Sequence, residues 1–123
     1  MKPIQLQKTT IDIPFVDAEG QQQLVIQFDR SDDNIKRLYN SFDSLEKAKN
    51  ELSTTDNDDV FEDTKSFIKK VMDPIFGDGT FDKIYALSPS VLVVVIYFYQ
   101  MAVALKEELE TDDFENFASK YLD

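Results

Sequence analysis

Residues 91–105 read VLVVVIYFYQMAVAL, and Gln100 is the only one of them outside the hydrophobic class. Nowhere else is the chain so apolar, although its formal net charge is -11. As a helix this stretch spans about 22 Å, which is shorter than the ~30 Å hydrocarbon core of a bilayer. We therefore expect a buried helix or a protein–protein contact here, and no membrane span.

The residues before this stretch favour a helix. Ser88 suits the N-cap, and Pro89 suits the first helical position, where its missing N–H costs nothing. The β-branched run from Val91 to Ile96 is also typical of a buried strand. The whole stretch is longer than ordinary strands, so we predict a helix.

Two opposite faces of this helix are apolar. The first is an ordinary core stripe of Val91, Val94, Val95, Phe98, Met101, Ala102, Leu105 and Leu109. The second holds Val93, Ile96, Gln100, Val103 and Ala104, followed by Glu107. A helix that is apolar all round is either enclosed in its domain or shared with a partner, and the sequence leaves both open. The candidate partner-binding residues are Val93, Ile96, Gln100, Val103 and Ala104.

The N-terminal quarter of the chain alternates between apolar and polar residues, as β-strands do. The apolar positions are Ile11, Ile13 and Phe15, and then Leu24, Ile26 and Phe28. Residues 17–20 (DAEG) supply turn chemistry between them, with Gly20 able to take positive φ. We predict a hairpin over about residues 10–28, packed on helices because two strands alone are marginal. Ile4 and Leu6 continue the alternation, so they extend the first strand or begin a third.

The period becomes helical at Ser31, a candidate N-cap followed by Asp32 and Asp33. We predict one helix from there to about residue 52 and a second over about 59–73, which Pro74 ends. We expect Thr80 to cap a short helix and residues 112–122 to form a last amphipathic helix. The expected inward residues before residue 91 are Ile35, Leu38, Tyr39, Phe42, Leu45, Leu52, Val60, Phe61, Phe67, Ile68, Val71, Met72, Phe81, Ile84 and Leu87, and in the last helix Phe114, Phe117, Ala118, Tyr121 and Leu122.

These elements predict a single α+β domain over residues 1–123. Its hairpin region covers 1–30 and its helical region, of four to five helices, covers 31–123. The first residues, MKPIQ, lack the apolar segment of a signal peptide, so we expect a soluble cytoplasmic protein.

Composition excludes many kinds of chemistry. The chain has no histidine and no cysteine, which excludes Ser-His-Asp and Cys-His catalysis, thiol redox chemistry, structural zinc sites and disulfides. No glycine loop for phosphate is present, and carboxylate pairs such as Glu107 and Glu108 lie in no recognisable apolar pocket. We therefore expect no enzymatic activity, no catalytic residues and no cofactor.

The charge balance argues against nucleic-acid binding. The chain has 24 acidic and 13 basic residues, and its basic residues are scattered, whereas phosphate contacts need clustered Lys and Arg. The acidic clusters are Asp56, Asp58, Asp59, Glu62 and Asp63, and then Glu107, Glu108, Glu110, Asp112, Asp113 and Glu115. They are typical of solvated helix starts and linkers, and a DNA mimic or a dock for a basic partner is the alternative.

Residues 77–81 (GDGTF) resemble the middle of an EF-hand loop. Alignment on Gly79 puts Pro74 and Phe76 at the first and third ligand positions, and Tyr85 at the bidentate glutamate. Hard cations need oxygen at all three places. We therefore expect a turn between two helices and no metal site.

Three segments resemble those of a known family: FDRSDDNI at 28–35, VMDPIF at 71–76 and FGDGTFDKIY at 76–85. With the hairpin before them and the apolar helix after them, they are similar to the small acidic tail assembly chaperones of long-tailed phages and prophages of Gram-positive bacteria. The resemblance covers about residues 11–105. It implies a helper absent from the virion that coats the tape measure protein and recruits the tail tube protein. The family has no catalytic residues and often has a frameshifted longer form.

The physical features are compatible with this function. A tape measure protein is long, helical and apolar along one stripe, so a helix-rich acidic partner would cover it and keep it in solution. The same surface would also allow a homo-oligomer. The alternatives are an acidic DNA mimic that inhibits host defence and a structural adaptor component of the virion.

Overall fold

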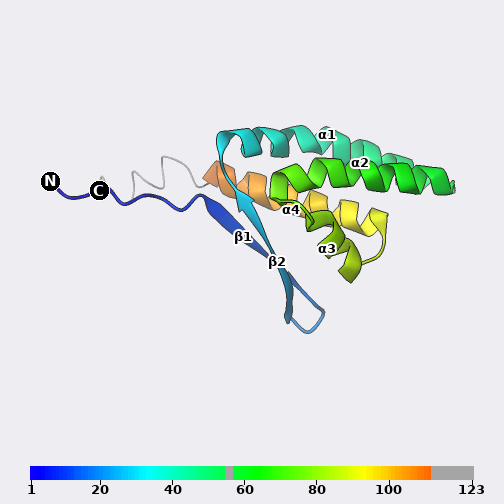
Figure 1. Cartoon of the computed structure of the whole chain (residues 1–123), viewed down its shortest axis with the longest axis horizontal. Helices are drawn as coiled ribbons and strands as arrows, with labels where there is room; N and C mark the ends of the chain where they lie inside the picture. The colour runs from blue at the N-terminus through cyan, green and yellow to red at the C-terminus, as the bar shows by residue number, and fades with distance from the viewer. Residues whose placement is uncertain (55–56, 112–123) are drawn as a thin grey trace.

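The computed structural model describes residues 1–54 and 57–111, and within them an antiparallel hairpin precedes four helices (Figure 1). The elements are β1 (Thr10–Val16), β2 (Gln22–Asp29), α1 (Asp32–Thr54), α2 (Asp58–Phe76), α3 (Thr80–Leu87) and α4 (Val91–Thr111). The predicted α+β class is confirmed. The helix expected over 112–122 lies outside the described residues.

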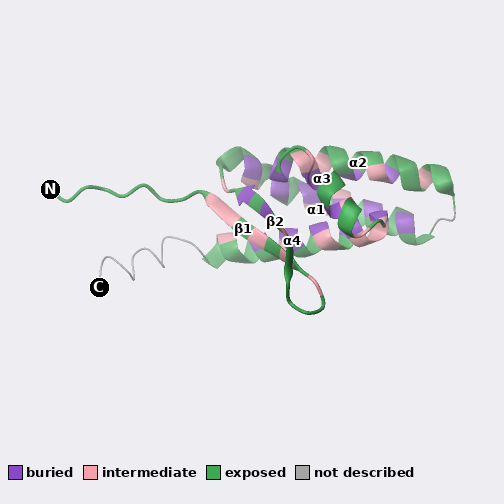
Figure 2. Cartoon of the chain, turned by 60° about the horizontal axis from the view of Figure 1, so that its bottom comes forward, coloured by how far each residue is buried: buried purple, intermediate pink, exposed green. Residues whose placement is uncertain are grey.

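The hairpin forms as its alternation predicts. Ile13 pairs with Ile26, and Gly20 takes a φ of 81° in the turn, where the Asp17 carboxylate accepts the Glu19 N–H at 3.0 Å. The apolar face packs on the helices most fully at the base of the hairpin, where Phe28 is completely buried, while the tip is exposed (Figure 2). The expectation for Ile4 was wrong, because residues 1–9 join neither strand.

The core lies where β2, α2 and α4 meet. The Phe76 ring lies 6.1 Å from the Phe28 ring and 5.6 Å, edge to face, from the Phe98 ring. Such aromatic contacts add about 0.5–1.5 kcal/mol each beyond the area that they bury. α1 closes the core from one side with Leu38 and Leu45, which are buried as the sequence predicts.

A buried amide joins the hairpin to two helices. The Asn34 Nδ2 of α1 donates to the Asp29 carbonyl at the end of β2 and to the Ile75 carbonyl at the end of α2, both at 2.8 Å. Both carbonyls end a secondary-structure element and need a donor from outside it. Asn34 therefore fixes the ends of β2 and α2 to the start of α1.

The predicted stop at Pro74 was wrong, because α2 continues to Phe76 with Pro74 in its last turn. The buried side chains of Ile75 and Phe76 hold that turn against the core. A proline near the end of a helix removes one backbone hydrogen bond, and burial of two large side chains offsets that loss. Gly77, at a φ of 111°, then ends the helix.

The starts of α3 and α4 differ from the prediction. Gly79, with a φ of 85°, is the N-cap of α3, while the Thr80 hydroxyl donates to the Gly77 carbonyl. α4 begins at Val91 and not at Pro89, because the Ser90 hydroxyl accepts the Val93 N–H at 3.3 Å. The start of α1 after Ser31 agrees with the prediction.

Some residues expected inside lie at the surface: Tyr39, Phe61, Phe67 and Leu87 are 36–49% exposed. They flank the buried stripes of their helices. Each helix has neighbours on only part of its circumference, so side chains at the edges of an apolar stripe remain in solvent.

Within the described residues no single helix is long and apolar enough to span a membrane. α3 and α4 reach the required length and hydropathy only as a pair, and the chain bends by 119° between them.

Candidate protein-interaction surface

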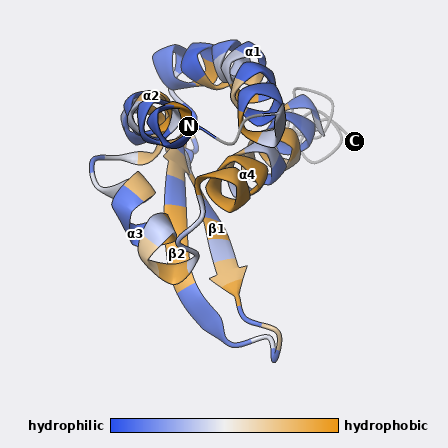
Figure 3. Cartoon of the chain, turned by 90° about the vertical axis from the view of Figure 1, so that its right-hand side faces the viewer, coloured by the Kyte–Doolittle hydropathy of each residue, from blue (hydrophilic) through white to orange (hydrophobic). Residues whose placement is uncertain are grey.

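The predicted partner-binding residues form one ridge along the outside of α4. Ile96 is 42% exposed, Gln100 and Ala104 are also exposed, and Val93 and Val103 are half-buried. The opposite face carries the core residues, of which Val94 and Phe98 are completely buried. The described residues therefore do not enclose α4, and the alternative of an exposed apolar face is the one that they support. We call these five residues the α4 ridge. Figure 3 shows α4, which is largely hydrophobic, between α1 and β1.

A groove of about 650 Å³ separates the ridge from α1. Its apolar surface comes from Ile96 and Tyr99 of α4 and from Phe42 of α1. The rings of Phe42 and Tyr99 meet edge to face at 6.2 Å, although Tyr99 is 52% exposed. We call this hollow the α1 groove; its lining residues are Phe42, Asp43, Leu45, Glu46, Lys49, Val95, Ile96, Tyr99 and Gln100.

Charged side chains surround this apolar surface. The Lys106 Nζ lies 5.8 Å from the centre of the Phe42 ring, on the side of α4. On the side of α1, Asp43, Glu46 and Lys49 line the groove. An apolar centre with a charged rim is the usual arrangement of a protein-binding surface.

A smaller groove, of about 280 Å³, lies between α4 and β1. Val16 is 58% exposed beside it, and the ring of Phe15 packs edge to face on that of Tyr97 at 5.6 Å. Gln100 lines both grooves, so it lies on the crest that divides them. We call this hollow the β1 groove; its lining residues are Ile13, Pro14, Phe15, Val16, Tyr97, Gln100, Met101 and Ala104.

The structure thus brings Ile96, Gln100 and Ala104 into grooves, whereas Val93 and Val103 line neither of them. The sequence argument missed Tyr99, which lies beside Ile96 on the helix. It also assigned Phe42 to the core, although Phe42 is only half-buried. A helical projection shows that Tyr99 borders the ridge, but only the tertiary structure shows that α1 lies beside it.

The glycine-rich segment after α2 is a turn between two helices. The Asp73 carboxylate accepts the N–H groups of Gly79 at 3.3 Å and Phe81 at 3.0 Å, so it caps the start of α3. No group of three or more acidic side chains among the described residues is arranged to hold a metal ion.

The acidic clusters lie on exposed helix ends where the structure describes them. Asp58 and Asp59 occupy the first turn of α2, where the Asn57 side chain accepts the Asp59 N–H at 2.9 Å. Negative charge is favourable at that end of a helix. Glu62 and Asp63 are exposed one turn further along α2, and Glu107, Glu108 and Glu110 are exposed near the end of α4. Asp56, Asp112, Asp113 and Glu115 lie outside the described residues.

One ion pair lies on the far side of the molecule, between α2 and α3. The Lys69 Nζ is 2.9 Å from the Asp82 carboxylate. This hydrogen bond, together with the charge of Asp82, raises the pKa of Lys69 above its usual 10.5. The pair is exposed on both sides, so it ties α3 to α2 only weakly.

Comparison with known proteins identifies no family for this chain. No family model matches the chain, and neither a curated protein sequence nor a solved structure matches it significantly.

Proposed function

We propose that this chain is a non-catalytic tail assembly chaperone of a long-tailed phage or prophage. In the bacterial cytoplasm it binds the tape measure protein and helps to recruit tail tube subunits. The observation that supports the proposal is the α4 ridge, an apolar helix face left exposed in a chain of net charge -11. The phage assignment itself comes from the resemblance of residues 28–35 and 71–85.

The α1 groove has the form that an amphipathic helix requires. Helices pack at about 8–10 Å between axes, with the side chains of one helix inserted between those of the next. An apolar stripe laid along the ridge would contact Ile96, and the touching rings of Phe42 and Tyr99 would form the floor beneath it. A tape measure protein offers such a stripe along its length, so many copies of this chain would bind one partner.

Charge explains why the complex would remain in solution. Burial of apolar surface supplies the binding free energy, at about 25 cal/mol per Å² of area removed from water. The exposed carboxylates of α1 and α4 would stay outside the contact and repel other coated complexes. The contact is therefore hydrophobic, and we expect it to tolerate salt.

Co-expression with the tape measure protein encoded nearby tests the proposal. We expect a soluble complex with many copies of this chain, retained at low salt and at about 0.5 M salt, where the Debye length is under ~5 Å. Ile96→Asp should abolish capture of the tape measure protein. Leu87→Asp is the matched control, because Leu87 is a similarly exposed aliphatic residue, 49% accessible, on α3.

Other outcomes would contradict the proposal. Salt-sensitive capture of a basic DNA-binding enzyme, without the tape measure protein, would identify a DNA mimic. Presence of the chain in purified virions would identify a structural adaptor. Equal loss of binding in Ile96→Asp and Leu87→Asp would show that the α4 ridge is not the contact.

A further inference from the structure

Residues 1–9 form an arm that contacts neither strand as part of the sheet. Ile4 and Leu6 are 90% and 91% exposed, and Figures 1 and 2 show the arm running away from the helices beyond the start of β1. The two side chains therefore leave apolar surface on a projecting segment open to contact with another surface.

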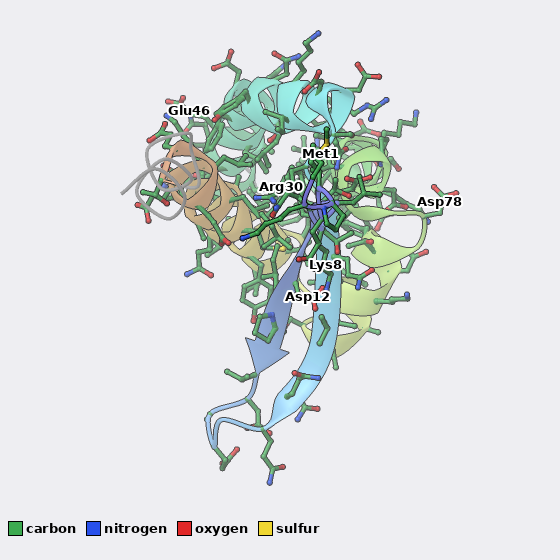
Figure 4. All side chains as sticks on the ribbon, turned by 90° about the vertical axis from the view of Figure 1, so that its left-hand side faces the viewer. Met1, Lys8, Asp12, Arg30, Glu46 and Asp78 are labelled. Atoms are coloured by element: carbon green, nitrogen blue, oxygen red, sulfur yellow. The ribbon has the colours of Figure 1, made fainter. Side chains whose placement is uncertain are left out.

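The base of the arm is held in place by Arg30, the residue directly after β2. The Arg30 N–H donates to the Thr9 carbonyl, and its guanidinium donates to the Lys8 carbonyl, both at 2.9 Å. Figure 4 shows Lys8 and Arg30 close together where the arm joins β1. These bonds direct residues 1–7 away from the grooves of their own chain, so the arm is positioned to reach a second molecule.

The arm is basic in a strongly acidic chain. Lys2 and Lys8 are its charged side chains, and all 24 acidic residues lie beyond it. In an extended backbone alternate residues point to the same side, so the two lysines flank Ile4 and Leu6 on one face. This face therefore fits an apolar groove that has a carboxylate near each end.

The lining of the β1 groove is uncharged, and a carboxylate adjoins each end of its β1 wall, the Asp17 carboxylate also accepting the Glu19 N–H in the turn. Val16 and Ala104 expose apolar surface in it, and Asp12 and Asp17 lie just before and after the β1 residues that line it. Along a strand Asp12 and Asp17 are about 17 Å apart, and Lys2 and Lys8 are about 20 Å apart. The flexible lysine side chains can absorb that difference.

We propose that the arm of one copy binds in the β1 groove of a second copy of this chain. Ile4 and Leu6 contact Val16 and Ala104, and the two lysines lie near the carboxylates at the ends of the groove. Pro14 has no N–H, so the outer edge of β1 cannot form a complete ladder, and side chains carry the contact. Because arm and groove are different surfaces, mutual exchange closes a dimer and one-way exchange builds a chain of copies.

This contact shares Ala104 with the α4 ridge, but it does not rest on the proposed function and is tested on the chain alone. Light scattering after size-exclusion chromatography should give the wild-type chain a concentration-dependent mass above its 14.2 kDa monomer. The double variant Ile4→Asp/Leu6→Asp should be a monomer. Gln5→Asp/Gln7→Asp adds the same charge to the other face of the arm, so it should still associate.

A second variant alters the groove and keeps the arm. Val16→Lys places a cation at an exposed position where the arm lysines would be repelled, and we expect it to be a folded monomer by circular dichroism. Mixed with Ile4→Asp/Leu6→Asp, it should form a one-to-one pair, because one chain supplies the arm and the other supplies the groove.

A wild-type chain that stays monomeric throughout the concentration series would overturn the proposal. So would equal loss of association in the Gln5→Asp/Gln7→Asp control, because the apolar face of the arm would then be irrelevant. A mixture that remains monomeric would show that arm and groove do not meet.

Discussion

Replacing Asn34 by alanine removes both hydrogen bonds that tie the ends of β2 and α2 to α1. A hydrogen bond contributes about 1 kcal/mol net, and an unpaired buried carbonyl costs about 1–3 kcal/mol. The bond to the Ile75 carbonyl is buried, whereas the Asp29 carbonyl is only partly buried and can regain water. Within the described residues the Asn34 Oδ1 has no partner, so its removal loses no bond.

The expected loss in the free energy of unfolding is about 2–3 kcal/mol, after about 0.5 kcal/mol of gain because alanine favours helix. For a chain of this length that lowers Tm by about 6–15 °C. Urea unfolding followed by circular dichroism measures the loss directly. The slope with urea should not change, because the same surface is exposed on unfolding.

Two further variants isolate the cause. Asn40→Ala makes the same substitution at an exposed position of α1, so it should lie within about 0.5 kcal/mol of the wild type. Asn34→Asp keeps the shape but removes the donor, and it should be at least as destabilised as Asn34→Ala. Our reasoning would be refuted if Asn34→Ala and Asn40→Ala unfolded at the same urea concentration.

Three more predictions follow from burial, backbone geometry and charge. Val95→Asp should lower the free energy of unfolding by several kcal/mol, because Val95 is 1% exposed. The adjacent Ile96→Asp should remain folded, because Ile96 is 42% exposed. An unfolded Ile96→Asp in circular dichroism would place the ridge in the core. Gly79→Ala should lower the free energy of unfolding by about 1–2 kcal/mol, because alanine is strained at a φ of 85°. No atom lies within 4 Å of the added Cβ, so the backbone strain is the whole effect. An unchanged Tm would contradict this. The pKa of Lys69 is raised in the folded state, so the stabilisation from its pairing with Asp82 is complete below pH 10.5 and is lost as pH rises through the higher folded pKa. The difference in Tm between wild type and Asp82→Asn should therefore be the same at about pH 7 and about pH 9, and it should shrink above pH 10.5.

The hairpin and the core face of α4 could be predicted because each depends on a repeat of apolar residues along a short stretch of the sequence. Phe28 and Phe98 are buried where period 2 and period 3.6 place them. The end of α2 could not be predicted in this way. The local preference of Pro74 to stop a helix is weaker than the burial of Ile75 and Phe76, which depends on β2 and α4.

The candidate surface was predictable only in part. The sequence places Ile96 and Gln100 on the outer side of α4, and the structure leaves both exposed. Which neighbours complete the two grooves depends on the packing of α1 and β1 against α4. The helical period alone therefore places Phe42 in the core stripe of α1 and assigns Tyr99 to neither apolar face of α4.

The central position of α4 affects how the chain is made. Phe98 and Met101 fill the middle of the core, yet they are synthesised after the hairpin and after α1, α2 and α3. Until α4 leaves the ribosome, Phe28 of β2 can pack on Phe76 of α2, but Phe76 lacks the Phe98 ring on its other side. Contacts between segments so far apart in sequence form late, and the exposed apolar faces are prone to aggregation in the meantime. A nascent chain that stops before Val91 therefore has its helices without its core, and the protein acquires its fold only after α4 has been synthesised.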